Sequence, residues 1–380
     1  YAYTNTENTF GINAVGGDVL LHANEGSIVL AGDLYVNASA RGGVKDPAIA
    51  ATTNAQGGSV RILLEGPSPI SSRMSFADID FNADGSIAAG AETTPRFEGN
   101  GGSGFGGDIT FDLLGGTFIA GNVVASASGA GGEGGSETAL SNGNGNGNVP
   151  TPDLSALVEP MDLSVVNTPT AGGTSAGDGG DGQGGDVTFN LNGGNATVTN
   201  LTISADGFGG NGAYGDILNG TAGGDGGRGI GGNATFNAIS GNLTVTNTLS
   251  VSAEANNPAS APSAAYAAGG FGYGSDGGNG GAGIGGTAIF NMTGSATIDA
   301  GDVRVSTSAT GGYGGTTSDR FDNIDAYIDG GPAGSGGDAT GGDAVLNDTS
   351  GTLTFTSATI ESVAVGGDGG SNFDNRGSFY

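Results

Sequence analysis

Apolar and polar residues alternate along the chain in short runs, and the segment 186–205 shows the pattern best. Val187, Phe189 and Leu191 alternate with polar residues, as in a strand with one buried face. A turn sequence follows at 192–194, and two further alternating runs occupy 196–199 and 201–205. The pattern predicts three short strands within about 22 residues.

The same unit occurs seven times, and each copy opens on a Gly-Gly pair followed by a small polar residue. The copies start near residues 16, 57, 106, 184, 231, 285 and 341. One unit cannot bury its apolar face, whereas stacked units give a continuous core. We therefore expect a single solenoid domain over 1–380, with a core ladder that runs from unit to unit through Phe111, Val187, Phe189, Phe236 and Phe290.

Three strands per unit, stacked in parallel, predict an all-β fold: a right-handed parallel β-helix of about seven coils, since parallel crossovers favour the right hand. Antiparallel hairpins in a sandwich are the alternative, because two-residue alternation describes them as well. The polar residue after each Gly-Gly pair is expected to hydrogen-bond the backbone at a corner. One outward position carries asparagine in four copies and predicts a polar ladder of Asn190, Asn237, Asn291 and Asn347.

Segments of about 15 to 55 residues separate the third strand of one unit from the first strand of the next. Glycine recurs at every third position in them, for example at Gly223, Gly226 and Gly229. A period of three is typical of the polyproline-II helix. We predict extended glycine-rich legs packed together on one side of the solenoid, with flexible linkers as the alternative. The long insertion 136–182 differs, because it contains several prolines and a mildly apolar run at 154–166.

Composition agrees with a repeat protein that acts outside the cell. Of 380 residues 83 are glycine, while cysteine and tryptophan are absent. Scarce proline and the lack of a chain-long Gly-X-Y period exclude collagen. The formal net charge of −29 disfavours nucleic acid and anionic lipid as partners. No apolar run is long enough to span a membrane, and the chain begins without methionine or a signal sequence, so we expect a mature or excised segment of a secreted protein.

Acidic side chains supply the candidates for catalysis. Asp78, Asp80 and Asp84 are close together in the second unit, and polysaccharide-cleaving solenoids use grouped acids. Solvated surface acids are the simpler interpretation, because no tryptophan is present to stack a sugar. His22 lies at an outward strand position without a serine or cysteine motif. We expect no catalytic residue and no enzymatic activity.

Calcium (Ca2+) is the candidate cofactor, because hard cations favour clustered carboxylate and carbonyl oxygens. One candidate ligand group lies in a Gly/Asp-rich run that loosely resembles calcium-binding nonapeptides without their tandem period. A second group has the spacing of a short amphipathic helical turn with a wet acidic face. The two groups are Asp178, Asp181 and Asp186, and Asp319, Asp322, Asp325 and Asp329.

Threonines recur at outward positions of the second strand, at Thr197, Thr244 and Thr354. Flat threonine arrays resemble the ice-binding face of antifreeze solenoids. Asp299 interrupts the array, and threonine is also a good outward strand residue. Ice binding is therefore a lesser alternative.

The repeat style, as in Gly-Gly-Asp-Val-Thr-Phe-Asn at 184–190 and Gly-Asn-Leu-Thr-Val-Thr-Asn at 241–247, resembles bacterial surface exoproteins of the filamentous-haemagglutinin and autotransporter-adhesin kind. The resemblance covers most of the chain. It implies an extracellular, cell-surface location and a structural role in a surface filament, fibre or adhesin stalk. The regular glycine-triplet insertions depart from the usual pattern of these proteins. A carbohydrate-active β-helix enzyme is the main alternative.

Self-association is the expected mode of assembly, because a β-helix has two open ends whose strand edges invite pairing with another chain. Neither end shows an amphipathic capping helix or a lysine-rich edge, so we expect head-to-tail stacking of copies. Continuation of the gene beyond this segment is the alternative. A surface polysaccharide, or a host or abiotic surface, is a further candidate partner. Candidate residues for contact with a neighbouring copy are Tyr1, Tyr3, Phe10, Ile12, Phe379 and Tyr380.

Overall fold

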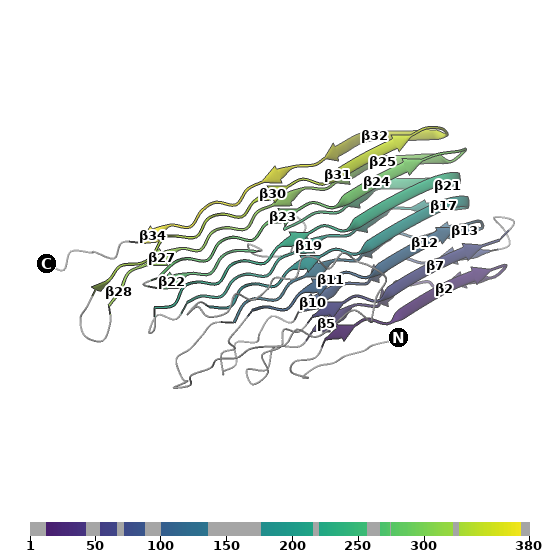
Figure 1. Ribbon diagram of the computed structural model, residues 1–380. Helices are drawn as coiled ribbons and strands as arrows, with labels where there is room; N and C mark the ends of the chain where they lie inside the picture. Colours follow the sequence, from purple (N-terminus) through teal and green to yellow (C-terminus); the bar gives the residue numbers. More distant parts are fainter. Residues whose placement is uncertain are drawn as a thin grey trace.

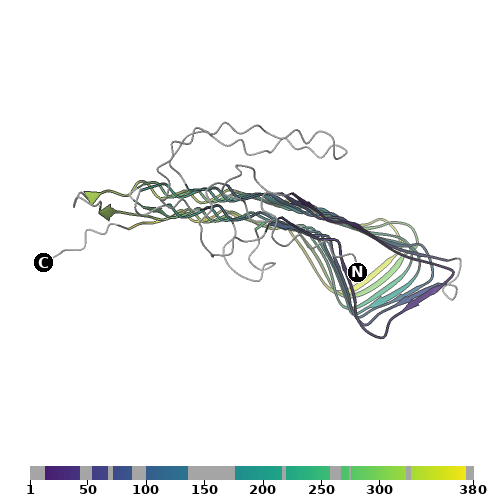
Figure 2. The ribbon, with the colours of Figure 1, turned by 90° about the horizontal axis from the view of Figure 1, so that it is seen from below.

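The computed structural model describes residues 13–42, 54–66, 72–87, 100–135, 176–215, 220–256, 267–273, 275–321 and 327–373. Within these ranges the fold is an all-β parallel β-helix of seven stacked coils (Figure 1). The sandwich alternative is wrong, because neighbouring coils pair in parallel with matching registers. From below, each coil has a triangle of strands at one end and two long legs at the other (Figure 2).

Three strands form the triangle of each coil. The first strands are β2 (Asp18–Asn24), β7 (Ser59–Glu65), β12 (Asp108–Leu113), the start of β17 (Asp186–Val198), the start of β21 (Asn233–Ser252), β24 (Thr287–Met292) and β31 (Asp343–Asp348). The second strands are β3 (Ser27–Val29), β8 (Arg73–Ser75), β13 (Thr117–Ile119) and parts of β17, β21, β25 (Thr297–Ser306) and β32 (Thr352–Glu361). The third strands are β4 (Leu34–Asn37), β9 (Ile79–Asn82), β14 (Asn122–Ser126), β18 (Asn200–Ser204) and the ends of β21, β25 and β32.

Short strands mark the places where the legs join the triangle. On the returning side they are β1 (Ala14–Val15), β6 (Ala55–Gln56), β11 (Gly104–Phe105), β16 (Gly182–Gln183), β20 (Gly229–Ile230), β23 (Gly283–Ile284) and β30 (Ala339–Thr340). On the outgoing side they are β5 (Ala40–Gly42), β10 (Gly85–Ile87), β15 (Gly129–Ala130), β19 (Gly207–Phe208), β26 (Ala309–Thr310) and β33 (Ala364–Val365). Further along the legs lie β22 (Gly272–Tyr273), β27 (Thr317–Ser318), β34 (Asn372–Phe373) and the antiparallel pair β28 (Arg320–Phe321) and β29 (Tyr327–Ile328).

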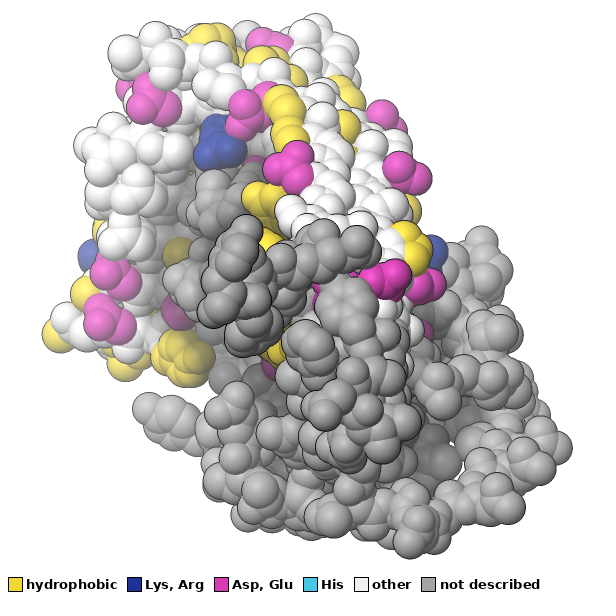
Figure 3. Space-filling view, turned by 90° about the vertical axis from the view of Figure 1, so that its left-hand side faces the viewer, with side chains coloured by type: hydrophobic (Ala, Val, Ile, Leu, Met, Phe, Trp, Pro, Cys, Tyr) yellow, Lys and Arg dark blue, Asp and Glu magenta, His cyan; other side chains and the backbone are white. Residues whose placement is uncertain are grey.

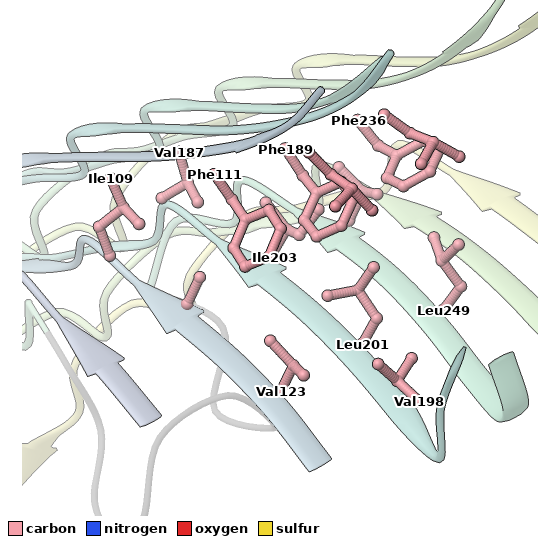
Figure 4. Close-up of a cluster of buried hydrophobic side chains, with 14 of the residues drawn as sticks. Ile109, Phe111, Val123, Val187, Phe189, Val198, Leu201, Ile203, Phe236 and Leu249 are labelled. Atoms are coloured by element: carbon pink, nitrogen blue, oxygen red, sulfur yellow. The ribbon is translucent and has the colours of Figure 1, made fainter. Parts of the chain in front are cut away.

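Inward-facing side chains of successive coils form continuous apolar columns. The rings of Phe111, Phe189, Phe236 and Phe290 stack on one another, with centroids 4.5, 5.3 and 4.9 Å apart. Figure 4 shows the first three of them. Val187 is 1% exposed and lies on the same strand as Phe189. Phe189 and Phe236 are covered by a ring on each side, while Ile62 and Leu346 cover the outer sides of Phe111 and Phe290. The column therefore buries apolar area that no single coil could bury.

The legs form two flat layers that lie against each other beside the triangle (Figure 2). The return layer comprises 100–107, 176–185, 221–232, 276–286 and 332–342; the outgoing layer comprises 129–135, 207–215, 267–273, 309–316 and 364–371. Within the return layer, the N–H groups of Gly223, Gly226 and Gly229 each donate to a carbonyl of the next leg at 2.8–3.0 Å. Gly224 and Gly227 donate instead to carbonyls of the outgoing layer at 2.9 and 2.8 Å. This period of three is that of a polyproline-II-like helix, so the flexible-linker alternative is wrong for the described legs.

The Gly-Gly-X triplets of the legs follow from these close backbone contacts. A Cβ on Gly227 would overlap the carbonyl oxygen of Gly180 in the same layer, and a Cβ on Gly226 would overlap the carbonyl oxygen of Ala267 in the other layer. The third residue of the triplet, such as Asp225, has room for a side chain and is exposed. At the two glycine positions of this triplet, the neighbouring carbonyl groups therefore leave no room for a side chain.

We expect Gly227→Ala to lower the free energy of unfolding by about 1–3 kcal/mol, because the added methyl group forces two legs apart. The matched control is Arg228→Ala, one residue on, which removes a partly exposed ion pair with Asp181 and should cost less than about 1 kcal/mol. Denaturant unfolding of both variants checks this. Equal losses for the two variants would show that the leg packing is not sterically tight.

Candidate functional site

The candidate catalytic acids of the second coil hold that coil to its neighbour. The Asp78 carboxylate accepts the backbone N–H of Asn122 at 2.7 Å, and the Asp84 carboxylate accepts that of Ser128 at 2.8 Å. Burial raises the pKa of Asp80 and of Asp84 above the ordinary value, while hydrogen bonds to each carboxylate oppose the rise. Asp78 and Asp84 thus have partners that explain their position without catalysis.

His22 lies on the outer face of the first coil. Its Nε2 atom is 3.0 Å from Oε2 of Glu65, and both side chains are more than a third exposed. The parallel register continues this outward column through Leu63 to Asp112. An exposed pair of this kind contributes little to stability, and the column contains no serine or cysteine.

The candidate calcium ligands of the Gly/Asp run are separated into different ladders between coils. Asp181 accepts the backbone N–H and the guanidinium of Arg228 at 2.8 and 3.0 Å. Asp178 and Asp186 accept a backbone N–H and a side-chain amide of the next coil at 2.9 and 2.7 Å. Among the described residues, no three acidic or histidine side chains are arranged to hold a metal ion.

The described ends of the second calcium group are extended rather than helical. Its flanks form the antiparallel pair β28–β29, so the helical prediction is wrong there. The backbone closes a hairpin instead, because the N–H of Gly330 donates to Oδ1 of Asp319 at 2.8 Å. Asp329 follows the second strand of the pair, while Asp322 and Asp325 lie outside the described residues.

The predicted asparagine ladder is confirmed. Side-chain amides link Asn190, Asn237, Asn291 and Asn347 from coil to coil at 3.0, 3.4 and 3.0 Å. By contrast, two of the polar residues after the Gly-Gly pairs, Ser59 and Asn233, donate to the carboxylate of the equivalent residue one coil earlier, each at 2.7 Å, rather than to the corner backbone.

The outward threonine array is broken in the structure as well. Thr197 and Thr244 are neighbours in register, but Asp299 separates Thr244 from Thr354. On the other side, Ile119 precedes Thr197. The column is therefore mixed in chemistry, which leaves no flat threonine surface along it.

A second kind of ladder was not anticipated from the sequence. In one column of the return layer, the outward side chain of each coil accepts the backbone N–H of the equivalent residue one coil further on. The distances are 3.0, 2.9, 2.7 and 3.0 Å along the column Asn100, Asp178, Asp225, Asn279 and Ser335. In the sequence, this ladder is marked by Asn, Asp or Ser at the X position of successive Gly-Gly-X runs.

Buried acids occur where the third strand passes into the outgoing leg. Asp206 and Glu254 are 6% and 3% exposed. Asp206 accepts the backbone N–H of Glu254 at 2.8 Å and the hydroxyl of Ser204 at 2.6 Å, and Glu254 accepts the hydroxyl of Ser306. Burial raises the pKa of Asp206 to about 6, against these hydrogen bonds and together with the nearby Glu254 charge.

The core offers no space for a substrate at its described cavity. That cavity is about 10 Å³, is lined by apolar residues that include Phe111, Phe189 and Ile203, and holds no more than about one water. The described residues also contain no helix that is long and apolar enough to cross a membrane.

The two ends of the β-helix expose core-facing apolar side chains that are buried in the inner coils. In coil 7, Phe355 and Ile360 are 40% and 48% exposed, whereas Ala300 and Val305, their equivalents in coil 6, are 5% and 0% exposed. Several core-facing residues of coil 1 are also incompletely buried, namely Val19, Leu21, Ile28 and Leu34. The candidate self-association residues Tyr1, Tyr3, Phe10, Ile12, Phe379 and Tyr380 lie outside the described residues.

We expect the protein to become more stable as the pH falls from about 7 to about 4, because of Asp206. Its pKa is about 6 in the folded state and near 3.8 when unfolded, so the folded state binds more protons between these values. The gain from this group is at most about 3 kcal/mol in the free energy of unfolding.

Asp206→Asn should remove most of that slope and raise stability at pH 7, because the amide is uncharged and still accepts the N–H of Glu254. Denaturant unfolding across this pH range measures the effect. Asp299→Asn, which changes an exposed carboxylate, is the control and should keep the wild-type slope. A slope that survives in Asp206→Asn would assign the effect to other acids.

Comparison with known proteins yields no relative: no family model, no curated protein and no solved structure matches the chain.

Proposed function

We propose that this chain is a structural extracellular protein that forms, or belongs to, a surface filament, fibre or adhesin stalk through end-to-end self-association. The observation that carries the proposal is one unbroken parallel stack whose first and last coils have unpaired edges among the described residues. Such edges present rows of free N–H and C=O groups that template pairing with another chain. The resemblance in repeat style to bacterial surface exoproteins supports the extracellular location.

The internal bonding supports a mechanical role. Every coil is joined to the next by strand ladders, by side-chain ladders and by hydrogen bonds between the two leg layers. The triangle of strands keeps a similar outline from coil to coil (Figure 2). A load along the axis is thus shared over many parallel bonds, which suits a stalk or fibre.

The surface charge supports axial rather than lateral growth. The formal net charge is −29, and acidic side chains are spread over the described face at the leg ends while basic ones are few (Figure 3). Like-charged side faces repel one another at moderate ionic strength. The apolar end edges are the described surfaces on which two copies gain most by contact.

Purified protein at micromolar concentration should form unbranched filaments in negative-stain electron micrographs and sediment as large species. Seven coils at about 4.8 Å each give an expected axial repeat of about 34 Å. Leu346→Lys, which places a charge in the core-facing column of coil 7, should abolish filaments because the charge would be buried at the contact.

The control is Tyr313→Lys, at a side chain 51% exposed on the outgoing layer, and it should assemble like the wild type. A stable monomer at these concentrations, with both end coils covered by its own residues, would overturn the proposed assembly.

A further inference from the structure

The second glycine of each Gly-Gly pair touches the coil before it. A Cβ there would overlap the carbonyl oxygen of the equivalent glycine one coil earlier, and this holds at Gly58, Gly107, Gly185, Gly232, Gly286 and Gly342. Gly17 is the equivalent residue of coil 1, and a Cβ on it would meet nothing within 4 Å. Its φ also lies outside the left-handed region, so no feature of the described chain requires glycine there.

The opposite end of the stack also has glycines at positions where a side chain would fit. In the outgoing leg of coil 6, a Cβ on Gly311 or Gly314 would overlap a carbonyl oxygen in the return leg of coil 7. The equivalent residues of coil 7 are Gly366 and Gly369, whose nearest atoms would be 3.8 and 3.7 Å away. Both ends thus keep glycine, which weakens extended structure, at positions where the described chain leaves room for a side chain.

We propose that coil 1 of one copy packs on coil 7 of another copy in the same register that joins successive coils within the chain. Gly17 then lies on Gly342, and Leu21 lies on Leu346, as each residue does on its equivalent inside the stack. This inference rests on the proposed self-association and adds its polarity, its register and the residues that define them.

Five apolar columns match across this junction, whereas a sixth core-facing position does not, because Ala23 of coil 1 would meet Asp348 of coil 7. Five core-facing positions of coil 1 meet apolar residues of coil 7, in the pairs Val19–Ala344, Leu21–Leu346, Ile28–Leu353, Leu34–Ala358 and Val36–Ile360. A shift by one residue would turn every core-facing side chain of one coil toward outward-facing residues of the other. The register is therefore specified by the columns themselves.

The ladders from side chain to backbone also continue. Asp338 occupies in coil 7 the column in which Asp181 accepts the N–H of Arg228 at 2.8 Å, and the first member of that column is Asn13. At the junction, the Asp338 carboxylate can accept the N–H of Asn13 from the second copy.

One like-charge pair opposes the junction, because Asp18 lies on Asp343. The same arrangement exists inside the protein, where Asp108 lies beside Asp186 and burial, followed by the charge of Asp186, raises the pKa of Asp108. In the coil pair with Asn233 above Asp186, the amide donates at 2.7 Å instead. Asp18→Asn should therefore tighten association about tenfold and reduce its dependence on salt.

Gly17→Ala tests the close contact. Its thermal unfolding midpoint, measured on dilute unassembled protein, should equal that of the wild type, because the methyl group meets no described residue of the same copy within 4 Å. Filaments should be lost, since the methyl group would overlap the Gly342 carbonyl of the neighbour. Thr188→Ala, at an outward position of a central coil, is the control that keeps both properties. Wild-type filaments from Gly17→Ala would overturn the proposed register.

Introduced cysteines test the register even if a glycine variant fails to fold, because the chain has no cysteine of its own. Leu20→Cys combined with Val345→Cys places the two Cα atoms about 4.8 Å apart across the junction, within disulfide range. The same residues are about 29 Å apart within one chain, so a covalent ladder on a non-reducing gel reports contact between copies.

Leu20→Cys combined with Asn347→Cys is the offset control, at about 8 Å, and should not form the ladder. Cross-linking of the offset pair in place of the matched pair overturns the register and leaves the self-association standing. The absence of filaments from wild-type protein overturns the self-association itself.

Discussion

The close approach of backbones in successive coils is the constraint on which this structure depends. Parallel strands set a spacing that every part of a coil must follow, including the legs, which have no apolar core of their own. In the legs that spacing brings carbonyl oxygens to the place where a Cβ would stand, so Gly226 and Gly227 both have to be glycine. Side chains are then left to every third position, where they face outward and bond along the stack.

Much of the polar chemistry of the chain follows from this geometry. Carboxylates that look available for metal binding or catalysis are used to accept N–H groups of the next coil, as Asp78 and Asp178 do. Identical residues in register form ladders because stacking brings each one beside its own equivalent. The same arrangement leaves Asp206 buried beside Glu254, where hydrogen bonds offset only part of the cost of two neighbouring acids.

A stack of this kind has an intrinsic direction and two complementary ends. Each inner coil packs on the previous coil with one edge and on the next coil with the other edge. The first described coil lacks a previous coil, and the last described coil lacks a next one. The exposed Phe355 and Ile360 and the unconstrained Gly17 are consequences of that asymmetry. An end-to-end filament satisfies both ends with contacts that already occur six times within the stack.

The sequence by itself determined the repeat, the strand triplets, the phenylalanine column and the extended glycine legs, because alternation and a period of three report local geometry directly. It also placed the asparagine ladder, since identical residues at one phase meet when coils stack in register. It was wrong about the segment around Asp319, where spacing alone cannot distinguish a helical turn from a hairpin closed by a side-chain bond to Gly330.

Tertiary structure alone decided which acids are buried and which glycines are sterically required. Asp206 and Asp225 are the same residue type, yet one is enclosed at a corner and the other is exposed on a leg, because burial depends on which coils lie above and below. Likewise, Gly17 and Gly58 are both the second glycine of the repeated Gly-Gly pair. One faces open space and the other a carbonyl oxygen, and that difference exists only once the coils are stacked.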